Sequence, residues 1–165
     1  ALGHVLLSVV GFSAANVLFP KLAQNKEKPK VQRTYLLKGV GMIFLITIPF
    51  SVLASIFSVE ILNLLYTLSG QILAMAATVF VWTVWSLPFA CLTPLFARAY
   101  FANDDTKTPT KYTVISLSIA TGLAAYLSLV VLPAESAILG LALGNFTANI
   151  LNASLFGFGL WRKYR

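Results

Sequence analysis

The sequence is poor in cysteine, histidine and acidic side chains. Its 165 residues include one cysteine, one histidine and five aspartates and glutamates together. A single cysteine, Cys91, excludes an internal disulfide framework and a cysteine metal site. No Ser/His/Asp grouping, no glycine-rich phosphate loop beside a lysine and no metal-ligand spacing is present. We therefore predict that the chain is not an enzyme and that it uses no cofactor and no metal.

Charge of either sign is also scarce. Charged residues make up 10% of the chain and hydrophobic residues 58%, whereas soluble domains carry roughly 25% charged residues. The mean hydropathy is +0.83. This composition predicts a membrane protein. Because the chain opens at Ala1 inside an apolar segment, without an initiator methionine or a basic leader, we expect it to be a piece of a longer protein.

The twelve basic residues gather in three short clusters, within 21–38, 98–111 and 161–165. The long stretches between them are uncharged except for Glu60 and Glu135. Basic loops tend to stay on the cytoplasmic side of a membrane. Five crossings would place all three basic clusters there and both glutamates on the other side.

The net charge of +7 is compatible with two kinds of binding partner, nucleic acid or a lipid surface. The charges stand at the ends of apolar runs and form no basic helix face with interleaved aromatics, so we predict no nucleic-acid partner. Contact with anionic lipid headgroups beside the membrane explains them more simply. The lipid bilayer is thus the first predicted partner.

A helix needs about 20 apolar residues to cross the hydrocarbon. We predict an all-α fold: a single membrane domain, 1–165, forming a polytopic transmembrane helical bundle. Pro20 should end the first helix, Ser58 should cap a short interfacial helix, and Thr108 should cap the helix that Pro109 opens. The predicted membrane helices are 2–19, 34–57, 71–101, 109–132 and 137–161, and the predicted interfacial helix is 59–66.

Prolines interrupt two of the predicted helices, at Pro49, Pro88 and Pro94. Each should kink its helix, and neighbouring helices or Ser/Thr side chains must then satisfy the freed backbone groups. The prolines could be hinges for alternating access or static kinks. In the last helix, Gly140 and Gly144 form a small-xxx-small face suited to close helix contact.

Four asparagines lie inside predicted membrane helices, where polar groups often mark a pathway. Asn145, Asn149 and Asn152 share one face of the last helix through spacings of four and three, and Asn16 lies in the first helix. They could line a polar cavity or coordinate a lipid headgroup. Hydrogen bonding between helices is the alternative, and the sequence leaves both open.

Residues 95–109 (LFARAYFANDDTKTP) are the most specific part of the chain. They resemble the signature of the MurJ (MviN) lipid II flippases, in which a proline-bearing helix ends in an aromatic run followed by D-T-[KR]-T-P. Other segments are similar in order and spacing, so that the resemblance spans the chain. These segments are 16–22 (NVLFPKL), 46–49 (ITIP), 61–66 (ILNLLY) and 151–155 (LNASL).

The resemblance implies part of the second lobe of a two-lobed transporter of the multidrug/oligosaccharidyl-lipid/polysaccharide exporter superfamily. Such a protein would move the undecaprenyl-diphosphate-linked peptidoglycan precursor across the bacterial cytoplasmic (inner) membrane by alternating access, in cell wall biogenesis and maintenance of cell shape. The implied partners are this lipid-linked diphosphate precursor and the N-terminal lobe of the same protein. The family's cavity arginines lie outside this segment.

Within the matched motif, the resemblance implies an inner-loop clasp. Asp105 and Lys107 would order the turn, Thr108 would cap the next helix, and Arg98 near the cytoplasmic mouth could contact the incoming diphosphate. Thr106 and Pro109 complete the inner-loop motif. Two alternatives remain: a related polysaccharide-lipid flippase or drug/ion antiporter of the same superfamily, and a membrane scaffold that transports nothing.

Overall fold

The computed structural model describes residues 11–66, 70–131, 133 and 137–164. Every element in these ranges is helical, which confirms the predicted all-α fold. The helices are α2 (Ser13–Gln24), α3 (Pro29–Ile56), α4 (Ser58–Leu65), α5 (Gly70–Phe101), α6 (Lys107–Tyr126), the π-helix η2 (Leu127–Val131) that continues α6, and α7 (Ala137–Lys163).

Four of these helices are long and apolar enough to cross a membrane: α3, α5, α6 together with η2, and α7. At about 1.5 Å per residue each exceeds the roughly 30 Å of bilayer hydrocarbon. Half of the first predicted span, 2–19, lies outside the described residues, and 13–19 of the described half belong to α2. Four of the five predicted membrane helices are therefore confirmed as candidate spans.

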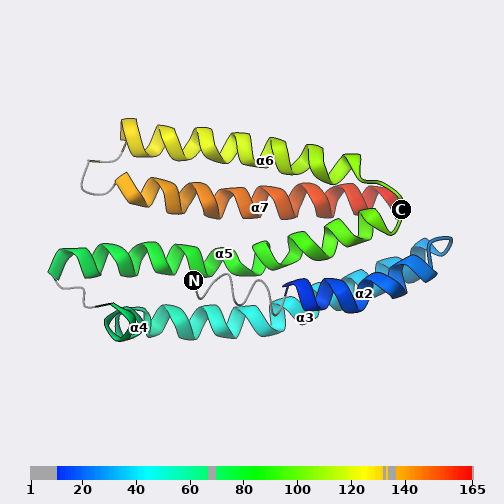
Figure 1. Ribbon diagram of the computed structural model, residues 1–165, viewed down its shortest axis with the longest axis horizontal. Helices are drawn as coiled ribbons and strands as arrows, with labels where there is room; N and C mark the ends of the chain where they lie inside the picture. Colours follow the sequence, from blue (N-terminus) through cyan, green and yellow to red (C-terminus); the bar gives the residue numbers. More distant parts are fainter. Residues whose placement is uncertain (1–10, 67–69, 132, 134–136, 165) are drawn as a thin grey trace.

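The long helices lie side by side with α5 in the middle (Figure 1). One side of α5 packs against α7, which carries α6 on its far side, and the other side packs against α3 and α2. The core follows α5, where Cys91, Leu95 and Ala99 have no exposed surface and meet Ile43 of α3 and Leu22 of α2.

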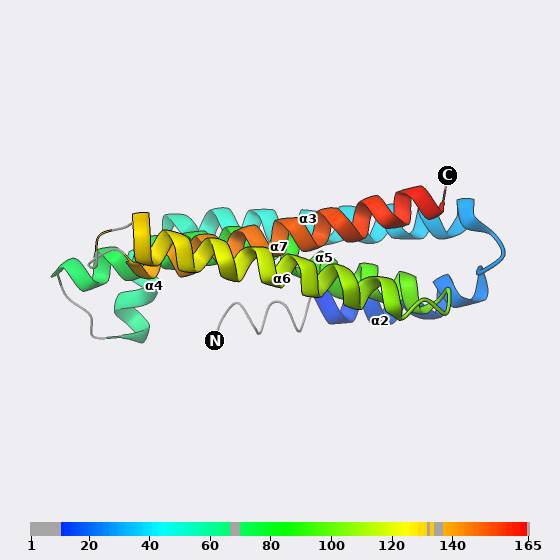
Figure 2. The ribbon, with the colours of Figure 1, turned by 90° about the horizontal axis from the view of Figure 1, so that it is seen from above.

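The short helix α4 runs steeply across the bundle axis at one end (Figure 2). Leu62 is buried, whereas Leu64, Leu65 and Tyr66 are exposed. A short helix with this orientation and exposed apolar side chains is suited to the membrane interface. Its predicted cap is wrong: Ser58 is a buried first-turn residue, and no side chain caps α4.

The three basic clusters meet at the other end of the bundle. The α2–α3 loop, the α5–α6 turn and the end of α7 lie together there, while α4, η2 and the first turn of α7 lie opposite (Figure 1). Glu60, in α4, is therefore remote from the basic clusters. Glu135 lies outside the described residues.

Several predicted helix ends are wrong because helices continue beyond the apolar stretch that defines them. Pro20 lies inside α2, which runs on to Gln24 and buries Leu22. α3 begins at Pro29 rather than at Thr34, because proline at the first helical position has no N–H to leave unsatisfied. Only 25–28 connect α2 to α3, and α7 extends to Lys163 rather than ending at Trp161.

Both proline-bearing spans remain helical, and Figure 1 shows a bend in α5. Pro88 has no N–H for the carbonyl of Val84, one turn earlier. The hydroxyl of Ser51, on α3, donates to that carbonyl at 3.0 Å. A serine of a neighbouring helix thus satisfies the group that the proline frees, as expected.

The Gly140 and Gly144 face packs against α6 and η2. A Cβ at Gly144 would lie 2.5 Å from the Cβ of Ala124 and 3.1 Å from the carbonyl oxygen of Ala120. Gly140 faces Ser128, whose hydroxyl donates to the carbonyl of Ala137 at 2.8 Å. The two glycines therefore allow the close helix contact that their spacing predicts.

Candidate functional site: a polar network at the basic end

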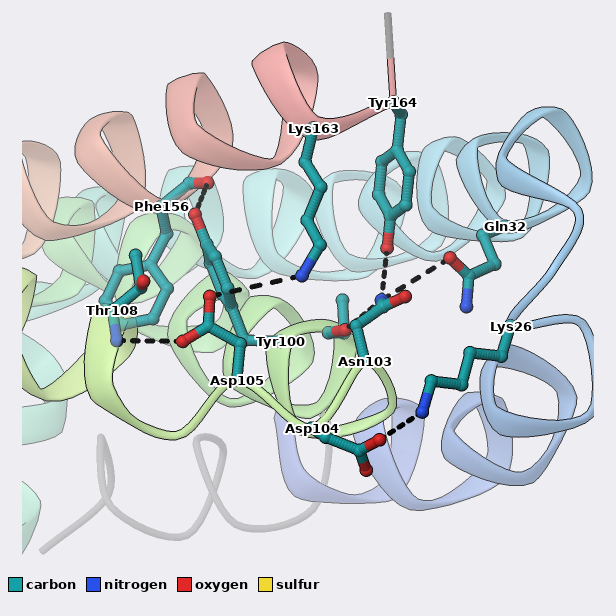
Figure 3. A network of polar contacts seen from close by, with 11 residues as sticks. Lys26, Gln32, Tyr100, Asn103, Asp104, Asp105, Thr108, Phe156, Lys163 and Tyr164 are labelled. Atoms are coloured by element: carbon teal, nitrogen blue, oxygen red, sulfur yellow. Dashed lines mark hydrogen bonds and ion pairs between the residues drawn. The ribbon is translucent and has the colours of Figure 1, made fainter.

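The turn between α5 and α6 directs two adjacent carboxylates to different partners (Figure 3). Asp104 has a φ of 58°, in the left-handed region that aspartate tolerates better than most residues. The backbone N–H of Asp105 donates to the carbonyl of Tyr100 at 3.1 Å and fixes the turn. Asp104 then faces Lys26 of the α2–α3 loop, and Asp105 faces α6 and Lys163.

Asp105 orders the start of α6. Its Oδ1 accepts a hydrogen bond from the backbone N–H of Thr108 at 3.1 Å, and its Oδ2 lies 4.0 Å from Nζ of Lys163. Partial burial raises the pKa of Asp105, but hydrogen bonds from Thr108 and the charge of Lys163 outweigh this effect, and the pKa lies below the usual 3.8.

The prediction that Thr108 caps the helix is therefore wrong. α6 begins at Lys107, with Thr106 before it, and no side chain of Thr106 makes a cap bond. Asp105 supplies the carboxylate acceptor three residues before Thr108, the spacing of an N-cap bond. Pro109 is consequently the third residue of α6 rather than the first, still within the turn where its missing N–H costs nothing.

Asn103 joins three helices. Its Nδ2 donates to the carbonyl of Ala99 at 2.8 Å and to the hydroxyl of Tyr164 at 3.1 Å, and lies 3.4 Å from Oε1 of Gln32. Gln32 is fully buried, and its Nε2 donates to the carbonyl of Leu22 at 2.7 Å. The ends of α2, α3, α5 and α7 are thus connected through two amides.

We call this group the inner polar network. Its members come from the α2–α3 loop and α3, from the α5–α6 turn, and from the end of α7: Lys26, Gln32, Asn103, Asp104, Asp105, Lys163 and Tyr164. Burial raises the pKa of the Tyr164 hydroxyl above its usual 10.0, although the bond from Asn103 opposes this. Tyr164 therefore remains a neutral phenol at physiological pH.

Arg98 lies about one turn of α5 before this network, among residues of α2. Its guanidinium donates to Oδ1 of Asn16 at 3.2 Å and stands 5.4 Å from the centre of the Phe19 ring. The structure thus brings together two candidate residues, Arg98 and Asn16, that the sequence places 82 positions apart. A guanidinium has five N–H donors, so an anion could bind Arg98 without displacing Asn16.

The asparagines of α7 have different hydrogen-bond partners. The side chain of Asn149 bonds the backbone and side chain of Asn145 within the same helix, at 3.1 and 3.3 Å. Oδ1 of Asn152 lies 3.5 Å from the hydroxyl of Ser116 on α6, which donates to the carbonyl of Tyr112 in its own helix at 2.8 Å. The roles predicted for Asn145, Asn149 and Asn152 in substrate binding or gating stay predictions.

The segment of α5 that holds Pro88 and Pro94 lies against the start of the described chain. A Cβ at Gly11 would lie 3.2 Å from Cα of Cys91 and 3.3 Å from Cγ of Pro94. Together with the bond between Arg98 and Asn16, this approach places the residues around α2 along the proline-bearing half of α5.

Sequence reasoning missed Gln32, Asn103 and Tyr164. One signal for Gln32 was available: it begins a series of residues spaced by three and four that forms the buried face of α3.

Lys107, which was predicted to order the turn, is exposed and its side chain makes no hydrogen bond or ion pair within the described part of the chain. Among the described residues no group of His, Cys, Asp and Glu could hold a metal ion.

Comparison with known proteins places this arrangement in a family. The family model described as "Lipid II flippase MurJ" matches residues 2–165. A curated relative, the "Probable lipid II flippase MurJ" of Rhizobium tropici, is 29% identical over 173 residues, covering 95% of this chain. The chain spans 30% of the length of that relative. No solved structure matches. The chain therefore belongs to the MurJ lipid II flippase family.

Proposed function

We propose that the protein containing this chain translocates the undecaprenyl-diphosphate-linked peptidoglycan precursor across the bacterial cytoplasmic membrane by alternating access. The chain would supply part of its second lobe. The observation that carries the proposal is the family match over residues 2–165. The motif 95–109 supports it, because these residues form one continuous unit: the end of α5, the turn and the start of α6.

The physical task is to move a charged diphosphate and a polar sugar-peptide through hydrocarbon, where an unpaired charge is very costly. A cation near the cytoplasmic mouth would attract the diphosphate. Arg98 is suited to this role because a guanidinium stays charged and binds phosphate oxygens in a fork-like geometry. Asn16 and Phe19 would hold it in position.

The inner polar network would act as the cytoplasmic gate. It connects the α2–α3 loop, the α5–α6 turn and the end of α7, the three segments that lie together at the basic end of the bundle. Its ion pairs are partly exposed, and such pairs contribute only about 0–1 kcal/mol each. Contacts of this strength can break and re-form in each transport cycle.

Depletion of the full-length protein tests the function. An impermeant amine-reactive reagent added to intact spheroplasts labels only the precursor in the outer leaflet. We expect depletion to lower this labelled fraction and to leave precursor in the inner leaflet, and we expect the full-length gene to restore it. Unchanged outer-leaflet labelling after depletion would refute the assignment.

Arg98 and Asn16 can be tested in the same assay. We expect Arg98→Gln to reduce transport strongly, because glutamine can bond Asn16 but carries no charge. Asn16→Ala keeps the charge and should reduce transport less. If Arg98→Gln transports as well as the wild type, Arg98 only anchors α2 and does not contact the diphosphate.

A further inference from the structure

A cavity of about 470 Å³ lies at the end of the bundle opposite the inner polar network, between α3, α4, α5 and the start of α7. Phe50 of α3, Leu62 of α4, and Ile72 and Leu87 of α5 are among its lining residues. We call it the outer groove. Its volume falls within the roughly 300–1,000 Å³ of small-molecule sites.

Water is a poor occupant of the outer groove. Thr83 is one of the few polar side chains that line it, and its hydroxyl already donates to the carbonyl of Val79 at 2.8 Å. A buried water needs about two to four polar partners. The only other hydroxyl among the lining residues is that of Tyr66, at the end of α4, and the rest of the lining is apolar. Hydrocarbon therefore suits this space better than water.

The outer groove has the length and direction of a lipid chain. Its lining along α5 extends from Ile72 to Leu87, which corresponds to roughly 22 Å of helix axis. α5 is a candidate membrane span, so the groove runs across the leaflet from interfacial depth to beyond the middle of a hydrocarbon layer roughly 30 Å thick. Tyr66, 56% exposed, stands at the interfacial end.

We propose that the outer groove binds one acyl chain of a bilayer phospholipid, with its headgroup outside α4. A further transmembrane helix does not fit inside, because a helix about 10 Å wide and 22 Å long occupies roughly 1,700 Å³. α4 lies across the bundle end (Figure 2) and would cover the bound acyl chain at that end of the groove. The bound chain would hold α4 against α5, and this inference needs no assumption about the transported substrate.

Photolabelling of the full-length protein tests the proposal. The protein is reconstituted in phosphatidylethanolamine/phosphatidylglycerol vesicles that contain a phospholipid with a diazirine on one acyl chain, and labelled peptides are mapped after illumination. We expect Met75 and Val79, which line the groove, to be labelled several-fold more than Leu129, which is 83% exposed on η2.

A matched pair of variants on α5 separates groove binding from general lipid contact. Ala76 lines the groove, whereas Ala74, two residues away, is exposed and does not. We expect Ala76→Phe to reduce labelling of Met75 and Val79 several-fold and Ala74→Phe to leave it unchanged. Circular dichroism and size-exclusion chromatography check that both fold, and Ala76→Leu replaces Ala76→Phe if it does not.

Three outcomes would overturn the proposal: equal labelling of Val79 and Leu129, no effect of the groove-filling variant, or labelling by a diazirine polyprenyl phosphate but not by the phospholipid. The last outcome would assign the groove to a prenyl chain. Labelling does not require transport, so its failure is distinguishable from failure of the proposed function.

Discussion

At the scale of single residues, Asp105 determines how α6 begins. Its carboxylate takes the N–H of Thr108, which would otherwise lack an intrahelical partner. We expect Asp105→Ala to destabilise the full-length protein by about 1 kcal/mol, the usual cost of losing an N-cap acceptor. Thermal unfolding in detergent measures this. Asp104→Asn, which removes the charge of an exposed ion pair and keeps a residue that tolerates the positive φ, is the control and should cost less.

The pKa of Asp105 also predicts a pH dependence. Because folding lowers this pKa below 3.8, the ionised carboxylate contributes stability that is fully present above that value. The contribution is lost as the pH falls through the lower pKa of the folded state. The gap in unfolding temperature between the wild type and Asp105→Asn should therefore narrow below about pH 4. A gap independent of pH would contradict this account.

The sequence predicted part of the site at this scale. Asp105 and Arg98 stand in a short, specific motif, so their importance could be read locally. Gln32, Asn103 and Tyr164 could not, because each depends on how far its helix is rotated and on partners more than 60 residues away. The cap prediction fails for a local reason: Thr108-Pro109 predicts a helix that starts at Pro109, whereas α6 begins two residues earlier, at Lys107.

At the scale of helices, Ser51 compensates for Pro88. Ser51→Ala leaves the carbonyl of Val84 without its donor, and we expect a loss of about 1 kcal/mol, near the upper range for hydrogen bonds between membrane helices. Ser55→Ala is the control, since that hydroxyl bonds the carbonyl of Ser51 in its own helix. The unfolding temperature of the detergent-solubilised protein measures the loss in each variant.

A double-mutant cycle makes this prediction sharper. Pro88→Ala supplies a backbone N–H that can bond Val84, so Ser51→Ala should cost less in that background. Equal costs in both backgrounds would show that Ser51 acts independently of the proline. The same Pro88→Ala variant tests the hinge interpretation, because a static kink can be removed without loss of transport.

Gly144 determines how closely α7 approaches α6. A methyl group there would overlap Ala124, and overpacking of this kind costs about 1–3 kcal/mol. We expect Gly144→Ala to lower the unfolding temperature. Gly122→Ala is the control, since no atom lies within 4 Å of its Cβ position. An equal decrease in both variants would show that the cost does not arise at the α6–α7 contact.

Hydropathy predicted the long helices well because the bilayer dictates a minimum length of apolar sequence. It could not predict where they end, since backbone hydrogen bonding continues into polar turns beyond the hydrocarbon. α3 starts within the basic cluster at Pro29, and α6 changes to a π-helix at Leu127. The packing of α7 against η2 through Ser128 accompanies that change.

At the scale of the whole molecule, charge distribution predicts sidedness. Asn25 lies in the α2–α3 loop at the basic end, and Asn63 is exposed on α4 at the opposite end. In a full-length protein without other reactive cysteines, we expect Asn25→Cys to react only with reagent that reaches the cytoplasm and Asn63→Cys to react from outside. Labelling of Asn63→Cys from the cytoplasm alone would overturn the orientation.

The charge pattern indicated which connections share a side, but not which helix lies at the centre. α5 occupies that place because it presents buried residues to α7, α3 and α2 in turn. Its own hydrophobicity is spread around the helix, so no single face predicted a neighbour. The order of the helices in the bundle therefore follows from how their side chains pack, and the number of apolar residues in each helix does not predict this packing.

The exposed pair between Lys26 and Asp104 has a consequence for cells that change their internal ion content. Its side chains are 49% and 79% exposed, so dissolved ions reach them, but the pair is in direct contact, well within the Debye length of about 8 Å at physiological ionic strength, and is screened only in part. When water leaves the cytoplasm and potassium accumulates, the hold on the α2–α3 loop weakens. The pair contributes only about 0–1 kcal/mol, so osmotic stress would alter this one contact and leave the buried bond between Gln32 and Leu22 in place.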